Sequence, residues 1–252
     1  MKLTHKLCGA ALLGAVGIGL AIPNTTKAAP DSKNGTGHIG FTSTGTYTHT
    51  DPGSSGGTQI TDLPIDNPEF GMVLVTPLEF DTHDLLTAQD KREYNALPHK
   101  ANPDSKTPGS EQFNVQNHVV FQDYREVTDH KYKLQAQLST EFSTGTKAID
   151  GAELLYQKTW LSLQDSNGTS PAGLAPSVTL SNDGLTPPNT ATLIDNSSAT
   201  GSTGYGVHAL NFGTVPAKIE DYDGVVMNIP AATKIEKGDY NATIVWTLTD
   251  AV

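Results

Sequence analysis

The sequence has almost no cysteine and few basic residues, and each shortage excludes a class of protein. Cys8 is the single cysteine among 252 residues, so no disulfide can form within the chain. Sixteen Lys and Arg residues stand against 27 Asp and Glu residues, which gives a net charge of −11. Since no basic tract is present that could neutralise a run of phosphates, nucleic acid is excluded as a partner.

Hydrophobic residues make up only 36% of the chain and aromatic residues 7%, while Gly and Pro contribute 24 and 15 residues. Val, Ile, Leu and Phe nevertheless recur in short clusters, which a β-sheet core can bury. The length suits one large all-β domain or two small ones.

The first 28 residues are typical of a secretory signal peptide. Lys2, His5 and Lys6 precede an uncharged apolar run, and Thr26-Lys27-Ala28 offers small residues before Ala29. The apolar run is shorter than the ~20 residues of a membrane-spanning helix. We therefore expect export with cleavage before Ala29, and no direct membrane insertion of the mature chain.

Two regions of different composition follow the signal peptide. Residues 29–68 are rich in Gly, Ser, Thr and Pro, and we expect this segment to belong only partly to the domain. Residues 69–252 alternate short β-type runs with turn clusters, which predicts an all-β, antiparallel β-sandwich-like single domain with long loops. A helical turn or two is expected only at Leu85–Asn95. The expected strands are Met72–Val75, Val115–Gln122, Tyr132–Ser139, Ala152–Tyr156, Thr159–Leu163, Ser177–Ser181, Gly224–Ile229 and Tyr240–Thr249.

Two of these strands alternate cleanly between apolar and polar residues. Tyr132 and Leu134 fall on one face of the first, and Trp246 and Leu248 on one face of the second. We predict that the two strands pair at the centre of a sheet and that these four residues share one packed cluster.

Motifs for catalysis are missing from the sequence. It has no His-Glu-x-x-His and no phosphate-binding glycine loop, and the Gly-x-Ser-x-Gly match at Gly53–Gly57 lacks the flanking strand and helix of a nucleophile elbow. We therefore expect no enzyme and no required cofactor. Two acidic turns, Asp165–Gly168 and Glu220–Asp223, could hold Ca²⁺, although neither has a complete ligand pattern.

Several segments resemble the WxL-domain cell-surface proteins of Gram-positive bacteria. The ending Gly238–Ala251, which contains Trp246-Thr247-Leu248, is similar to the C-terminal motif of that family. Asp123-Tyr124-Arg125 resembles the family's Asp-x-Arg, and Tyr132-Lys133-Leu134 stands where its first Trp-x-Leu is found. Pro77–Asp81 resembles an early Leu-x-Phe-Gly segment, with Asp81 where glycine is usual.

The resemblance implies a secreted all-β domain held non-covalently on the cell wall, with peptidoglycan as its partner and other surface proteins of the same assembly as further partners. It marks Tyr132, Leu134, Trp246, Leu248, Asp123 and Arg125 as candidate binding residues. Because the sequence shows no Leu-Pro-x-Thr-Gly sorting signal, we expect a non-covalent attachment.

Two alternatives stay open at the level of the sequence. The first concerns function. Besides a wall-binding module, the chain could be an adhesive subunit that binds partner proteins or host matrix, and a secreted glycan hydrolase ranks third. The second concerns Trp246, which either packs in the core or forms an aromatic platform for sugar rings, with Tyr132 beside it if the strands pair. For Asp123 and Arg125, two residues apart on one strand face, the simplest expectation is an ion pair that fixes the following turn.

Overall fold

The computed structural model describes residues 39, 47–53, 57–86, 91–102, 112–182 and 188–251. The chain divides into two compact units, Met1–Phe41 and Thr42–Val252. In the first unit only Ile39 is described, and it is exposed. The expected signal peptide, residues 1–28, and residues 54–56 of the Gly/Ser-rich loop lie outside the described residues.

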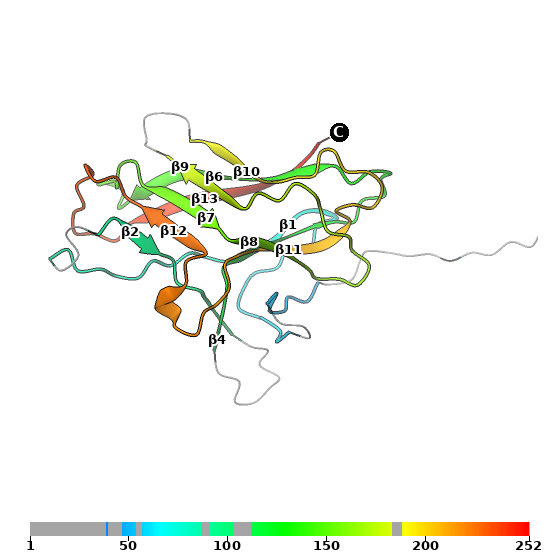
Figure 1. Ribbon diagram of the computed structural model, residues 1–252, viewed down its shortest axis with the longest axis horizontal. Coiled ribbons are helices and arrows are strands. Elements are labelled where there is room, and N and C mark those ends of the chain that lie inside the picture. Colours follow the sequence, from blue (N-terminus) through cyan, green and yellow to red (C-terminus); the bar gives the residue numbers. More distant parts are fainter. Residues whose placement is uncertain are drawn as a thin grey trace, which may run out of the picture. The chain divides into compact units, whose positions relative to one another are not determined.

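The second unit is built of antiparallel strands, which confirms the all-β prediction (Figure 1). One short 3₁₀ helix, η1 (Ile219–Asp221), is the only helix in the described ranges. The strands are β1 (Phe70–Val75), β2 (Glu93–Asn95), β3 (His99–Ala101), β4 (Phe113–Val115), β5 (His118–Asp123), β6 (Tyr132–Ser143), β7 (Glu153–Gln157), β8 (Thr159–Leu163), β9 (Ser177–Ser181), β10 (Thr190–Asp195), β11 (Gly206–Phe212), β12 (Val225–Asn228) and β13 (Asn241–Asp250).

The strands form sheets in the orders β1-β5-β11-β8, β10-β6-β13 and β2-β12-β7-β9, with β3 and β4 as a separate pair. One hydrophobic core joins the three larger sheets. It contains Phe121 of β5, Leu134 of β6, Leu154 of β7 and Leu210 of β11, each fully buried. With no disulfide available, this shared burial of apolar surface is the main source of stability.

The pairing of β6 with β13 follows directly from their alternating sequences. The two strands lie side by side and antiparallel (Figure 1), with Leu248 opposite Leu134 and Trp246 opposite Ala136. Across from the large indole, the small Ala136 leaves room for it. Any shift of register by one residue would turn the whole apolar set toward solvent, so the pattern itself fixes the pairing.

Three sequence expectations need correction. The run Val115–Gln122 is not one strand: β4 ends at Val115 and β5 begins at His118. Between them the Gln116 side chain bonds to Asn211, and the Asn117 amide donates to the Tyr222 hydroxyl in place of a strand carbonyl.

The helical expectation for Leu85–Asn95 is wrong at its end, where Glu93–Asn95 is strand β2 paired with β12. Burial of the Tyr94 side chain in the core favours the strand. Residues 87–90 lie outside the described part.

The third correction concerns β2, β3, β10 and β11, four strands that the sequence did not predict.

Part of the Gly/Ser/Thr/Pro-rich segment 29–68 is buried. His49 and Ile60 are 0% and 1% exposed, and the Ile60 amide donates to the His49 carbonyl at 2.9 Å. Ile60 packs with Ala101 and Val115 in a small satellite cluster.

Candidate functional site

The motif residues of β6 and β13 lie in one hydrophobic cluster. Tyr132 and Leu134 are fully buried, and Trp246 and Leu248 are partly buried against them. Antiparallel pairing separates the two aromatic rings, however, because Tyr132 stands opposite Asp250 and Trp246 opposite Ala136. Tyr132 therefore cannot extend a platform that starts at Trp246.

Tyr132 is held inside the protein by several contacts. Its hydroxyl donates to the Gly204 carbonyl at 3.1 Å, and its ring meets Phe121 edge-on at 5.9 Å between centroids. Burial, together with the negative charge of Asp123, raises the pKa of Tyr132. The side chain is part of the core and offers no surface to a ligand.

Asp123 and Arg125 form a nearly buried ion pair. The guanidinium donates to both carboxylate oxygens, from Nε at 2.9 Å and from Nη2 at 2.8 Å. His130 Nδ1 lies 3.0 Å from the same carboxylate, and Arg125 Nη1 reaches Asp250 at 2.8 Å. Burial raises the pKa of Asp123, but the hydrogen bonds from Arg125 and His130 outweigh it and keep that pKa below its usual range.

This cluster positions strands and does not itself present a site. The guanidinium carbon of Arg125 stacks 3.7 Å from the centroid of the Phe70 ring, and the Asp123 side chain is 0% exposed. The donors and acceptors of the pair are thus directed at one another and at the ends of β5, β6 and β13. A ligand would have to displace them.

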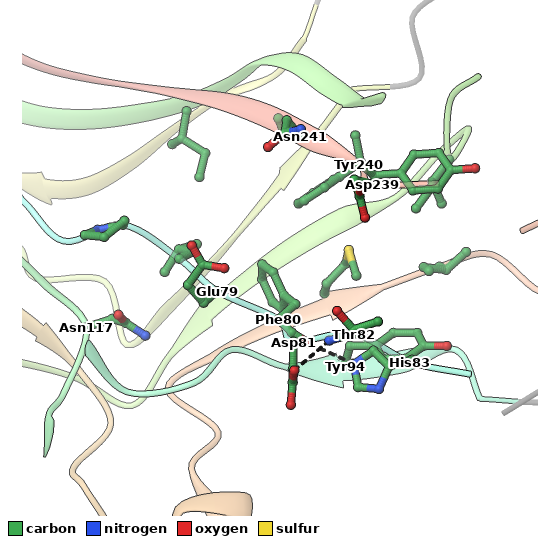
Figure 2. A pocket seen from close by; sticks show the side chains of 18 of the residues that line it. Glu79, Phe80, Asp81, Thr82, His83, Tyr94, Asn117, Asp239, Tyr240 and Asn241 are labelled. Carbon is green, nitrogen blue, oxygen red and sulfur yellow. Dashed lines mark hydrogen bonds between the residues drawn. The ribbon is translucent and has the colours of Figure 1, made fainter. Parts of the chain in front are cut away.

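A groove of about 1430 Å³ lies beside the first half of β13. One wall is the strap, residues 76–86, which follows β1. The other is β13 with the turn before it. Figure 2 shows Asp239, Tyr240 and Asn241 on one side of the groove and Glu79, Asp81 and His83 on the other.

The floor of the groove is aromatic. Trp246 meets Tyr156 edge-on, with ring centroids 5.5 Å apart, and Phe80 of the strap meets Phe142 in the same way at 6.0 Å. These rings line the groove together with Tyr240, which is half-buried. Trp246 is therefore core on one side and groove lining on the other, so the two roles considered for it are compatible.

The strap is fixed to the body by backbone hydrogen bonds. The Thr76 amide donates to the His118 carbonyl at 3.1 Å, and the Leu97 amide donates to the Glu79 carbonyl at 2.7 Å. Asp81 has a φ of 63°, in the left-handed region where glycine is favoured. Its side chain accepts a bond from the Thr82 amide at 2.7 Å, the local bond by which aspartate tolerates this conformation.

His83 closes one end of the strap. Its ring lies 4.5 Å from that of Tyr94, and its Nε2 lies 2.7 Å from the Phe80 carbonyl oxygen. The Lys91 ammonium lies over the Tyr94 ring, 4.8 Å from the ring centroid. The aromatic lining of the groove thus already attracts one cation of the chain itself.

In the first of the two acidic turns considered as Ca²⁺ sites, Asp165 is engaged in internal hydrogen bonds. Both oxygens of Asp165 accept hydrogen bonds, from the Tyr124 hydroxyl, the Val207 amide and the Asn167 amide. Across the ranges that the structure describes, no group of three or more His, Cys, Asp or Glu side chains is arranged to hold a metal.

Sequence reasoning found Trp246 but not the groove that it lines. Glu79 and Phe80 lie in the segment Pro77–Asp81, and Asp239 and Tyr240 lie at the start of the expected C-terminal strand, and only the fold places the two segments across from each other. The one available signal was position 81, where the resembled family usually has glycine, because glycine is favoured where φ is positive and the chain turns sharply.

A family model described as "WxL domain surface cell wall-binding" covers residues 28–251 of the chain. Comparison with curated proteins and with solved structures gives no match. In the described part of the chain, no helix is long and apolar enough to cross a membrane.

Proposed function

The chain belongs to the WxL family of cell-wall-binding surface domains, and from this premise we propose that it attaches non-covalently to peptidoglycan through the groove beside β13, without catalysis. The family match places the protein at the cell surface. It also indicates that the cell wall is what the protein binds. The ligand, the groove and the lack of chemistry are the proposed refinements.

The aromatic lining of an open groove is the observation that carries this proposal. Binding sites are typically concave and largely apolar, with a few polar groups that fix orientation. Here Trp246, Tyr240 and Phe80 provide half-buried rings, and Glu79, Asn241 and Asp239 provide polar groups around them. An N-acetylated sugar chain with attached peptides presents apolar ring faces and hydrogen-bonding edges that suit such a surface.

Sedimentation with insoluble peptidoglycan tests the proposal. The exported protein is incubated with purified peptidoglycan and centrifuged, and the soluble fraction is assayed for protein and for released sugar. We expect the protein in the pellet, no sugar release, and recovery of intact protein by denaturant. Protein that stays soluble would contradict wall binding, and released sugar would contradict the absence of catalysis.

Variants locate the binding surface. Tyr240→Ala removes a half-buried ring from the groove, whereas Tyr205→Ala removes one that packs on Tyr124 and His130 instead. We expect the first variant to sediment less with peptidoglycan and the second to sediment like the original protein. Equal losses in both would contradict the groove as the site.

An adhesive role has one observation in its favour. Strand β13 is at the end of its sheet and is ten residues long, so its outer edge could pair with a strand of another protein. Pull-down of wall-stripped surface proteins by the immobilised chain tests this second candidate. Recovery of a partner that competes with peptidoglycan would favour it.

A further inference from the structure

Three exposed carboxylates at the groove lack a cation of their own. Glu79 and Asp81 belong to the strap and Asp239 to the turn before β13. Within the described residues none of the three forms an ion pair, whereas nearby Glu236 is paired with both Lys147 and Lys234. One cation, Lys237, lies on the same rim, so the groove remains acidic overall.

One buried residue of the groove lining also has an acceptor without a partner in the described ranges. Asn117 lines the groove (Figure 2) and is 1% exposed. Its Nδ2 donates to the Leu97 carbonyl at 2.9 Å, but its Oδ1 accepts no hydrogen bond from the described part of the chain. An unsatisfied buried acceptor costs about 1–3 kcal/mol, which a ligand's N–H or O–H donor would recover.

These observations describe a groove that offers acceptors and negative charge above aromatic rings. Aromatic faces attract cations within about 6 Å, and the apolar stem of an alkyl ammonium packs along apolar surface while its charge stays solvated. Phosphate polymers and free carboxylates are repelled by the same surface. The complementary ligand group is an alkyl ammonium.

We propose that the groove recognises the free amino groups carried by the peptides of peptidoglycan, and that these amines, more than the glycan, determine binding. This proposal rests on the proposed function and specifies its ligand. The amine is held between Glu79 and Asp239 on the two walls, with Trp246 and Tyr240 against its alkyl stem. Asn117 accepts a bond from a neighbouring amide or amine of the same peptide.

Chemical modification of the wall tests the proposal. Purified peptidoglycan is divided, and the amines of one portion are acetylated, which removes their charge and leaves the glycan intact. We expect binding of the protein to acetylated peptidoglycan to be about tenfold weaker, equivalent to the loss of roughly one well-placed charge contact of ~1.4 kcal/mol. Equal binding to both portions would overturn the amine proposal while leaving peptidoglycan binding intact. Absence of binding to either portion would overturn both proposals.

A matched pair of variants separates the groove from the general negative charge of the protein. Glu79→Gln with Asp239→Asn removes two charges from the groove, and Glu126→Gln with Glu220→Gln removes two exposed charges elsewhere. We expect only the groove variant to lose the preference for unmodified peptidoglycan. A similar loss in both would show that the preference is non-specific attraction and would overturn the assignment to the groove.

Discussion

Arg125 Nη1 lies 2.8 Å from the carboxylate of Asp250, which joins the loop after β5 to the end of the last strand. The same guanidinium binds Asp123 through two further nitrogen atoms. Two segments that resemble WxL-family motifs, Asp123–Arg125 and the end of β13, are therefore in direct contact. Their shared role in this chain is to hold β13 in place, and β13 in turn forms a wall of the groove.

Substitution of Arg125 should lower the free energy of unfolding far more than substitution of Asp250, its exposed partner. Arg125→Ala leaves the fully buried Asp123 carboxylate without its cation, which typically costs about 3–5 kcal/mol. Asp250→Asn breaks a contact whose carboxylate is 48% exposed, and we expect a loss of about 1 kcal/mol or less. Urea unfolding of both variants measures the difference; equal losses would contradict the assigned burial.

Truncation of Trp246 should lower both stability and wall binding. The indole packs on Tyr156 and on Phe212, so Trp246→Ala opens a cavity in the shared core. Because the ring is only partly buried, we expect a loss near the lower end of the ~3–5 kcal/mol for a buried tryptophan. Trp246→Phe should retain most of the stability. Calorimetry of both variants, followed by peptidoglycan sedimentation, tests whether Trp246→Ala loses more stability and binding than Trp246→Phe. An unchanged melting temperature for Trp246→Ala would contradict the packing role.

How much of this architecture the sequence predicts depends on the environment of each strand. Strands β6 and β13 have one face in the core and one in solvent, so their alternating sequences revealed both the strands and their pairing. Strand β11 is buried on both faces and contains His208 and Asn211, so no alternation marks it. The groove could not be predicted, because its walls are two segments far apart in sequence that only the tertiary fold brings together.

Acidification should weaken the fold through a buried histidine pair. His49 Nε2 lies 3.0 Å from His118 Nε2, and His118 Nδ1 lies 2.8 Å from the Gln116 carbonyl oxygen. His118 must therefore carry its proton on Nδ1 and accept from His49 on Nε2, an arrangement that requires the His118 ring to be neutral.

Burial lowers the pKa of His49 to about 3 and that of His118 to about 4. Histidines in the unfolded chain have a pKa of about 6.5, so below that pH the unfolded state binds more protons than the folded state. The free energy of unfolding therefore falls as the pH drops from about 6.5 toward 4. Thermal unfolding between pH 7 and pH 4 measures this. We expect a fall of several degrees, and a smaller fall in His49→Gln/His118→Gln; the same pH dependence in both proteins would contradict the role of the pair.

Export should remove the first 28 residues. The basic start, the apolar run and the small residues at Thr26-Lys27-Ala28 predict that the mature chain begins at Ala29. The net charge of −11 would then become more negative by three, because Lys2, Lys6 and Lys27 are lost. N-terminal sequencing of the protein extracted from the cell surface tests this, and a chain that begins at Met1 would contradict it.

The central claim is that the groove beside β13 binds the cell wall. The fluorescence of Trp246, which lines this groove, tests it most directly, because the chain has only two tryptophans. Trp160 lies outside the groove and donates its indole N–H to the Gly213 carbonyl at 2.8 Å, so Trp160→Phe leaves Trp246 as the sole reporter. Titration with soluble peptidoglycan fragments should then shift the emission of the Trp160→Phe protein in a saturable way, while the Trp246→Phe protein should show no change. A saturable change from Trp160 alone would contradict the groove beside β13 as the wall-binding site.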